Sequence, residues 1–268
     1  MSEIELEFVR IPASEFTMGS NRSRDRHAHD DEMPAQLLSV TDYMIMRYPV
    51  TNAQYARFMQ VTGHRAPLFW TDGKYPETKA DHPVVGVSYY DAIAFCAWAT
   101  EQTGLPLRLP TEPEWEKAAR GAEPRVYAWG DQWKRDLCNT AEEKLNGTSP
   151  VKQYSPQGDS PYGVADVAGN VQEWCSSLFG AYPYDPADGR EAHVYDLHNQ
   201  DLLPKLLETG CTSMPESEEA SIGKSVLRGG SWREGSDQAR CAYRSWAAPM
   251  HRSDDTGFRC CYEPKNDL

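Results

Sequence analysis

The order of apolar and polar residues predicts strands near the N-terminal end of the chain, followed by three short helices. Residues 5–19 alternate loosely between apolar and polar side chains, which is typical of strands, and a further strand is expected over residues 36–46. The stretch between them, residues 20–34, has mixed charge and no periodicity. We therefore expect it to be a solvated loop that joins two strands.

Capping residues indicate where the three helices begin and end. The helices are expected within residues 51–62, 88–104 and 111–121. Ser88 and Thr111 each precede an acidic residue by three positions, which is the pattern of a capping box. Each helix is followed by a glycine that can end it, namely Gly63, Gly104 and Gly121.

The chain beyond residue 121 is rich in Gly, Pro, Asn, Asp and aromatic residues and is expected to be mostly irregular. Long loops inside a compact domain need partners for their backbone carbonyls, and bound calcium is one solution. Residues 191–224 are acidic and poor in aromatic residues, which indicates an inserted surface loop at about residues 189–224. We expect this loop to belong to one domain that spans residues 1–268.

Composition and charge disfavour several classes of function. The net charge of -13 argues against nucleic-acid binding, because that binding draws most of its affinity from Lys and Arg. No segment approaches the ~20 apolar residues that a membrane helix needs, and no basic start precedes an apolar run at the N-terminus. Seven scattered cysteines without a C-x-x-C pair favour reduced thiols and a cytoplasmic location. We therefore expect neither nucleic acid nor a membrane as a partner.

Seven short motifs follow one another across roughly residues 8–261. They are FTMG (16–19, preceded by Ile11-Pro12), YPVTNAQY (48–55), HPVVGVS (82–88), RLPTEPEWE (108–116), GNVQEW (169–174), RGGSW (228–232) and GFR (257–259). Each motif alone is weak, but in this order they resemble the formylglycine-generating enzyme, or sulfatase-modifying factor, family. The resemblance implies an irregular α+β fold similar to C-type lectins, with a few short helices, small antiparallel sheets and long loops.

This sequence differs from the copper-dependent members of that family at two positions that bind the metal. Two cysteines follow the Arg-Gly-Gly-Ser turn in those members, and here Glu234 and Ala239 stand in their places. A pair of soft thiolates selects Cu(I), which a carboxylate and a methyl group do not hold. Cys241 lies two residues past the second place and has no mate. We therefore expect neither copper nor copper-dependent formylglycine-generating activity.

Other charged or glycine-rich motifs are expected to be structural. Charged residues around Trp115 more often form a buried ion-pair network than an acid–base site. The Gly229-Gly230 pair gives a turn access to positive φ and matches no phosphate-binding loop. Iron-dependent members of the superfamily bind metal through histidines on a separate helical domain, whereas the histidines here are dispersed. His27 and His29 are the only close pair, and we expect them to lie in solvent.

The resemblance also implies two structural calcium sites. The residues that match the family's ligands are Asn139, Thr140, Glu143 and Leu145 for the first site, and Asp166, Gly169, Val171 and Glu173 for the second. Carboxylate, amide and backbone carbonyl oxygens are the hard ligands that calcium prefers. A loop held only by hydrogen bonds is the alternative at both sites.

The segment between Ser231 and Gly257 has the composition of a binding surface, because it mixes polar residues with large amphipathic ones. Enzymes of the family place their active site here. Proteins diversified by retroelements use a similar lectin-like fold and carry variable ligand contacts just before the final Gly-Phe-Arg. The ligand contacts predicted here are Trp232, Arg233, Glu234, Ser236, Asp237, Gln238, Ser245, Trp246, Met250, His251, Ser253 and Asp254.

Two functions from different classes stay open. The first is a calcium-stabilised binding protein that holds a protein or small-molecule ligand at this C-terminal surface. The second is a non-copper oxidoreductase or other modifying enzyme, with its substrate surrounded by Ser231, Glu234, Tyr243 and Arg244. Outside an enzyme, Arg240, Tyr243 and Arg244 are expected to anchor the turn, which leaves the residues between them freer to contact a ligand. An open surface would favour binding, whereas convergence on a deep pocket would favour an enzyme.

Overall fold

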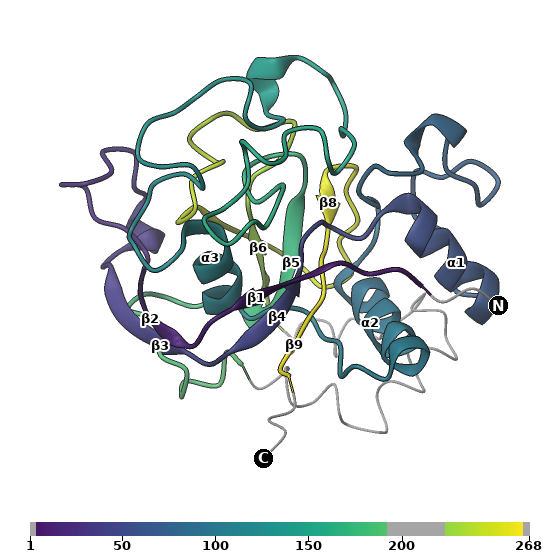
Figure 1. The fold of residues 1–268 in the computed structure, drawn as a ribbon, viewed down its shortest axis with the longest axis horizontal. Coiled ribbons are helices and arrows are strands. Elements are labelled where there is room, and N and C mark those ends of the chain that lie inside the picture. The colour runs from purple at the N-terminus through teal and green to yellow at the C-terminus, as the bar shows by residue number, and fades with distance from the viewer. Residues whose placement is uncertain (1–3, 192–222, 265–268) are drawn as a thin grey trace.

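Three α-helices and three small β-sheets form the part of the chain that this computed structural model describes, residues 4–191 and 223–264 (Figure 1). The predicted insertion at about residues 189–224 lies almost entirely outside the described residues. The helices are α1 Asn52–Thr62, α2 Tyr89–Thr103 and α3 Glu112–Arg120. The strands are β1 Phe8–Ile11, β2 Ser14–Met18, β3 Gln36–Val40, β4 Tyr43–Met46, β5 Gln172–Leu178, β6 Ser225–Arg228, β7 Arg244–Ala247, β8 Thr256–Gly257 and β9 Cys261–Tyr262.

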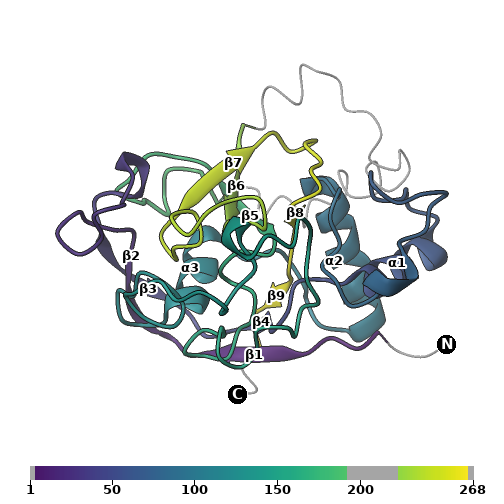
Figure 2. The same cartoon turned by 90° about the horizontal axis from the view of Figure 1, so that it is seen from above.

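The sheets join strands that are far apart in the sequence. One antiparallel sheet has the order β1-β4-β9, and β2 pairs with β3 in a second one. The third sheet has the order β7-β6-β5-β8, in which β5 runs antiparallel to β6 and parallel to β8. Figure 2 shows β1 and β7 on opposite sides of the molecule. Separate helices and mostly antiparallel sheets confirm the predicted α+β class.

The N-terminal segment departs from the prediction in two places. The single strand expected over residues 36–46 is two strands, because β3 pairs with β2 while β4 pairs with β1 and β9. Residues 20–34 are not a wholly solvated loop. Asp25 and Glu32 are buried, and a short 3₁₀ helix covers Asp30–Glu32. The prediction was wrong here because a distant arginine, Arg240, forms ion pairs with both carboxylates.

The three helices lie where their caps predict. Thr51, Ser88 and Thr111 each accept a hydrogen bond from a backbone N–H of the first turn, within complete capping boxes. Gly63 and Gly104 follow α1 and α2 in the left-handed conformation that ends many helices. Local chemistry therefore determines the helix ends in this chain.

The C-terminal half contains more regular structure than its composition indicates. It was expected to be mostly irregular, yet four strands there form the third sheet. The central strand β5 is buried at every residue except Leu178, so it has no polar face and no alternation. Its pattern was missed because period-two alternation marks a strand only when one face is exposed.

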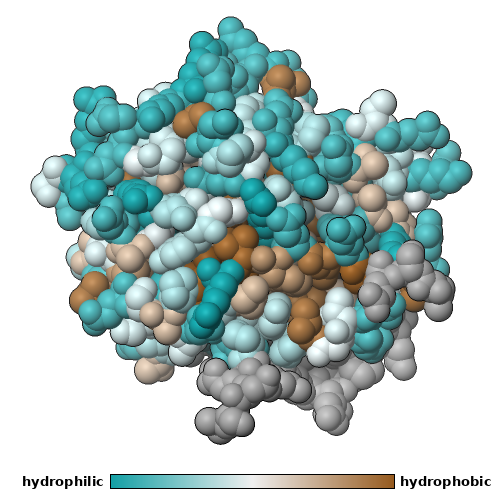
Figure 3. Space-filling model, in the orientation of Figure 1, coloured by the Kyte–Doolittle hydropathy of each residue, from teal (hydrophilic) through white to brown (hydrophobic). Residues whose placement is uncertain are grey.

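Two hydrophobic clusters make up most of the core. One surrounds α1 and α2 and contains Tyr55, Phe58 and Phe95, while the other surrounds Trp115 of α3. Figure 3 shows hydrophilic residues over most of one face of the molecule, with apolar residues gathered near its centre. Within the described ranges, no helix is both long enough and apolar enough to cross a membrane.

Four arginines of the C-terminal quarter reach into the interior and pair with carboxylates from earlier in the chain. These pairs confirm the predicted buried ion-pair network around α3. Glu112 and Glu116 pair with Arg228, and Glu112 also receives two hydrogen bonds from Arg244. The other pairs are Arg240 with Asp25 and Glu32, and Arg259 with Glu173.

Arg259 connects three separate parts of the fold. Its Nε and Nη2 atoms donate to the two carboxylate oxygens of Glu173, each at 2.6 Å. Its remaining N–H groups donate to the backbone carbonyls of Met46, Arg47 and Ala165. Since Arg259 and Glu173 are fully buried, removal of one leaves the other charge without compensation.

Replacing Arg259 tests whether this pair supports the fold. We expect Arg259→Met to lower the free energy of unfolding by about 3–5 kcal/mol, the usual cost of breaking a buried ion pair. Urea unfolding measures the change. The control is Arg10→Met, because Arg10 pairs with Asp42 at the surface, where such pairs contribute little. Equal stability of Arg259→Met and the wild type would contradict the prediction.

Candidate functional site

A tight glycine turn starts the C-terminal segment that carries the candidate site. Gly229 and Gly230 have φ angles of 99° and 67°, which confirms that the turn needs positive φ. A Cβ atom at Gly230 would lie 2.7 Å from the carbonyl oxygen of Gln238. This close approach folds residues 231–238 back on themselves, so that Ser231 begins a compact loop.

The loop is fixed at its far end by arginines. Arg240 is fully buried on Asp25 and Glu32, and Arg244 is buried on Glu112. Arg244, a residue that the sequence analysis placed around a substrate, is therefore occupied by Glu112 and also donates to the carbonyl of Asp31 at 2.9 Å. Its role in the structure is to anchor the chain.

Hydrogen bonds join the start of the segment to its end. Ser231 Oγ donates to Asp255 Oδ2 at 2.9 Å, and Ser253 Oγ donates to the other oxygen of Asp255. Trp232 Nε1 donates to the carbonyl of Asp254 at 3.2 Å. Residues 231–234 and 253–255 consequently form one surface, although about twenty residues separate them.

Glu234 lies on this surface and has unusual electrostatics. Burial, and next the charge of Asp255, raise the pKa of Glu234 to about 7, against the lowering effect of hydrogen bonds from Ser231. Its Oε2 atom is buried, and among the described residues it has no hydrogen-bond partner. A carboxyl group of this kind can take up and release a proton near neutral pH.

Tyr243 faces the same acidic surroundings. Burial and then the charges of Glu234, Asp31 and Glu32 raise the pKa of Tyr243 to about 12. Its ring also meets the ring of His29 edge to face, at 5.6 Å between centroids. The structure therefore brings Glu234 and Tyr243 together with an N-terminal loop that no motif had linked to them.

The predicted ligand contacts are spread over the loop that follows Gly230, over β7 and over the turns that follow β7. Ser236 and Asp237 bond to Glu142 and His27 respectively, next to Gln238. Trp246 is 44% exposed on β7, and the Nζ of Lys224 lies 3.4 Å from the centre of its ring. The remaining contacts lie on β7 or in the turn after it, and they are Ser245, Met250 and His251, with the His251 N–H donating to Ala248.

The described pockets lie elsewhere on the molecule. A pocket of about 480 Å³ is lined by α1 and residues 70–77, including Met59, Trp70 and Tyr75. It shares no residue with the surface formed by residues 231–234 and 253–255. None of these pockets is lined by Glu234 or Tyr243, so the deep pocket that would favour an enzyme is not among them, and the candidate site is defined by the interactions of Glu234, Tyr243 and their neighbours.

The residues at the family's copper positions do not fit copper. Glu234 offers a carboxylate, and the methyl group of Ala239 is fully buried. Cys241 is also fully buried in the core cluster around Trp115, and burial raises the pKa of its thiol to about 11. No thiolate pair that could hold Cu(I) is thus formed at this turn.

Some of the predicted calcium ligands lie on adjacent loops, whereas Glu173 already forms an ion pair with an arginine. The N–H of Asn170 donates to the carbonyl of Asn139 at 2.7 Å, so the loops of the two predicted sites are adjacent. Burial raises the pKa of Asp166 to about 8, although Arg259 and a hydrogen bond from Asn170 oppose the shift. Glu173, in contrast, is neutralised by Arg259.

The other predicted calcium ligands differ in exposure. Asn139 and Thr140 are buried, and their Oδ1 and Oγ1 atoms have no hydrogen-bond partner among the described residues. Glu143 pairs with Arg135 at 3.4 Å, and the side chain of Leu145 is exposed. Gly169 and Val171 are both buried, and they lie just before β5 in the chain.

Sequence reasoning missed the contribution of the N-terminal loop. His29, Asp31 and Glu32 reach the candidate surface, but more than 200 residues separate them from Tyr243. The run of acidic residues after His29 was visible in the sequence. No local pattern shows, however, that this run meets a tyrosine from the other end of the chain.

Known proteins with similar sequences and structures share the fold of this chain. Residues 3–264 match the sulfatase-modifying factor enzyme 1-like domain. A formylglycine-generating enzyme from Thermomonospora curvata is 30% identical over 98% of this chain and 95% of that enzyme. The structure of PvdO from Pseudomonas aeruginosa is 27% identical, with a TM-score of 0.72 over 96% of this chain and 94% of that one.

A third similarity concerns the fold alone. Treponema denticola variable protein 1 shares 23% identity with this chain, with a TM-score of 0.69 over 96% of this chain and 95% of that protein. Together these matches confirm an α+β fold of the formylglycine-generating enzyme and C-type lectin type. The chain belongs to the sulfatase-modifying factor enzyme 1-like family.

The pKa of Glu234 predicts how stability depends on pH. Its carboxyl has a pKa near 7 in the folded state, above the usual 4.5, so the folded state binds the proton more tightly than the unfolded state. The stabilisation from this proton is complete below about pH 4.5 and is lost as the pH rises through about 7. We expect the stability of the wild type, measured relative to Glu234→Gln, to fall over this range and then level off.

Urea unfolding of both proteins between pH 4 and pH 8.5 measures this difference. The control is Glu15→Gln, which replaces an exposed carboxyl group of β2 with an amide in the same way. A difference between wild type and Glu234→Gln that stays constant over the whole range would show that Glu234 titrates normally.

Proposed function

We propose that this chain is a copper-independent modifying enzyme of its family, in which Glu234 is the acid–base residue. The observation that carries the proposal is the buried Oε2 of Glu234, which has no hydrogen-bond partner among the described residues and whose carboxyl interacts electrostatically with Asp255 and Tyr243. A general base works best when its pKa lies near the working pH, and the environment of Glu234 brings about that condition. The hydroxyl of Ser231 holds Asp255 in place, and a backbone hydrogen bond from Ser231 supports the carboxylate of Glu234.

The neighbouring groups fit different roles around such a base. Tyr243 keeps its phenolic proton at neutral pH, because its pKa is about 12, and can therefore donate a hydrogen bond to a substrate oxygen. Arg244 is held by Glu112 and positions the strand instead of contacting a substrate. Of the four residues that were expected to surround a substrate, the enzyme proposal therefore uses three, namely Ser231, Glu234 and Tyr243.

The second candidate function is ligand binding without turnover. Exposed Trp246, with Lys224 stacked over its ring, provides an aromatic and cationic contact area of the kind that recognises proteins or small molecules. The fold that this chain shares with Treponema denticola variable protein 1 supports this alternative at the level of architecture only. The two candidates differ in whether a bound compound is converted, so one turnover experiment can separate them.

Turnover of a thiol and peptide panel separates the two functions. The purified chain is incubated in air with cysteine-containing peptides and small thiols, and products are followed by mass spectrometry and oxygen consumption. We expect Glu234→Gln to slow product formation by about 10²–10⁴-fold, the usual contribution of an acid–base residue. The wild-type rate should rise with pH through about 7 as Glu234 loses its proton.

The matched control for this assay is Glu15→Gln, in which an exposed glutamate outside the site loses its charge. It should keep the wild-type rate. Panel members that bind with equal affinity to the wild type and Glu234→Gln but are never converted would overturn the enzyme proposal and support ligand binding.

Calcium is the second part of the proposal, with a structural role. Asp166 is buried, and within residues 4–191 and 223–264 its carboxyl receives one side-chain hydrogen bond, from Asn170 Nδ2 at 3.3 Å. The orphaned oxygens of Asn139 and Thr140 lie on the adjacent loop and are hard donors of the type calcium prefers. Glu173 is not counted as a free ligand, because Arg259 donates to both of its oxygens and Trp115 Nε1 donates to Oε2 as well.

Thermal unfolding in calcium and in a chelator tests this role. We expect calcium at 100 to 1,000 times its Kd to stabilise the wild type by about 3–4 kcal/mol relative to EGTA. Asp166→Asn should abolish the difference. The control is Asp136→Asn, because Asp136 is an exposed acidic residue that shares the positive φ of Asp166. Identical melting of the wild type in calcium and in EGTA would exclude the site.

A further inference from the structure

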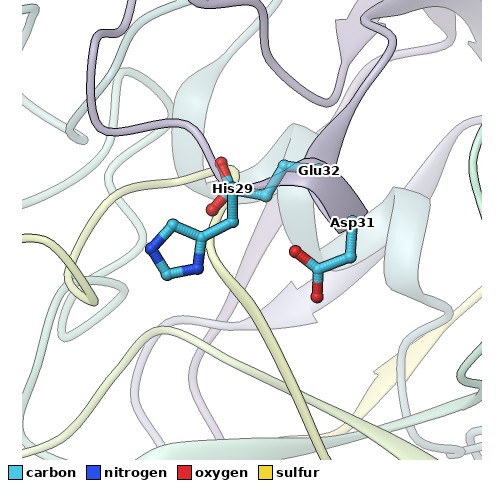
Figure 4. A group of neighbouring side chains, drawn as sticks. All are labelled: His29, Asp31 and Glu32. Atoms are coloured by element: carbon cyan, nitrogen blue, oxygen red, sulfur yellow. The ribbon is translucent and has the colours of Figure 1, made fainter.

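Three side chains of the N-terminal loop form a group that could hold a metal ion (Figure 4). His29, Asp31 and Glu32 each offer one ligand atom, and these atoms lie within 4.8 Å of one another. His29 and Asp31 are exposed, whereas Glu32 is fully buried. It is the only such group of histidine, cysteine or acidic side chains found in the described ranges, 4–191 and 223–264.

The backbone and the buried member of this group are already held in position. Arg240 donates to both oxygens of Glu32, at 2.6 and 2.7 Å, and leaves each oxygen a further lone pair. Arg244 donates to the backbone carbonyl of Asp31 at 2.9 Å. Hydrogen-bonded support of this kind around ligating carboxylates is typical of protein metal sites.

The exposed members can complete a coordination shell. Ligand atoms bound at about 2.1 Å from one metal lie roughly 3–3.5 Å apart, so His29 and Asp31 must rotate inward. Their exposure leaves room for that rotation. The ring of Tyr243 contacts the imidazole of His29 edge to face and restricts its orientation.

Charge around the group favours a cation. Asp31 and Glu32 bring two negative charges, while Asp25 and Glu32 share the single positive charge of Arg240. Two carboxylates and a neutral imidazole match the charge of a divalent ion. Because an imidazole is included, the donor set suits a transition metal of the manganese-to-zinc series better than calcium or copper(I).

We propose that His29, Asp31 and Glu32 bind one divalent transition metal ion at the edge of the candidate site. Three protein ligands leave coordination positions open to water or to a substrate. Tyr243 contacts the ring of His29 and also senses the charge of Glu234, so the ion would lie near the surface on which Glu234 acts. Metal binding itself is independent of the enzyme proposal, whereas a role for the ion in turnover rests on it.

Binding of cobalt and manganese to the full chain tests the proposal. The metal-free protein is kept in excess calcium, so that hard-oxygen sites are filled, and is titrated with CoCl₂ and MnCl₂ by calorimetry and by the visible absorption of cobalt. We expect one equivalent to bind to the wild type. His29→Ala and Asp31→Asn, both at exposed positions, should each weaken binding at least about tenfold.

The matched control is His27→Ala, which removes the neighbouring exposed histidine that contacts Asp237 instead. It should bind cobalt as the wild type does. Equal affinity in the wild type, His29→Ala and Asp31→Asn, or no binding to the wild type at all, would overturn the metal site.

Glu234→Gln separates this proposal from the proposed function. A metal site that is correct keeps its affinity in Glu234→Gln, whatever happens to turnover of the thiol panel. If His29→Ala loses cobalt while Glu234→Gln keeps the wild-type rate, the metal site stands and the acid–base role of Glu234 fails. If Glu234→Gln loses activity while cobalt binds His29→Ala normally, the acid–base role of Glu234 stands and the metal site fails.

Discussion

Buried guanidinium–carboxylate pairs hold this fold together and position the candidate site. Arg228, Arg240, Arg244 and Arg259 are all buried and each pairs with at least one carboxylate from an earlier part of the chain. Because an isolated charge is costly in the interior, each pair requires both partners to be present. The C-terminal quarter is therefore fixed against the N-terminal loop, α3 and β5 at the same time.

The candidate site is notable for a carboxyl that lacks this compensation. Glu32, Glu112 and Glu173 each have an arginine, whereas no ion pair joins Glu234 to a basic side chain in the described part of the chain. Burial and the nearby charge of Asp255 consequently raise the pKa of Glu234 to about 7. The same scaffold thus stabilises structural carboxylates and leaves one carboxyl free to exchange a proton.

Membership of a family and the chemistry of a member are separate matters in this chain. The sulfatase-modifying factor enzyme 1-like domain covers residues 3–264, so the scaffold is that of the family. The side chains at the copper positions are nevertheless Glu234 and Ala239. A fold can keep its architecture while a few substitutions replace a soft metal site with an acid–base one. Function in this family must therefore be argued from the site.

The sequence alone determined the features that depend on neighbouring residues. Thr51, Ser88 and Thr111 predicted the helix starts, because a cap bonds to backbone groups only three residues away. The glycine turn at residues 229–230 was equally local. The order of the motifs predicted the fold family and located Glu234.

Only the tertiary structure decided what depends on distant partners. It buried Glu32 in a stretch that reads as a solvated loop, because the charge that neutralises it lies at Arg240. It also formed a sheet around β5, whose uniform burial gives no alternation. Most importantly, it placed His29 against Tyr243, whose pKa is also raised by the charge of Glu234. Contacts across more than 200 residues leave no local pattern in a sequence, since they depend on how the whole chain packs.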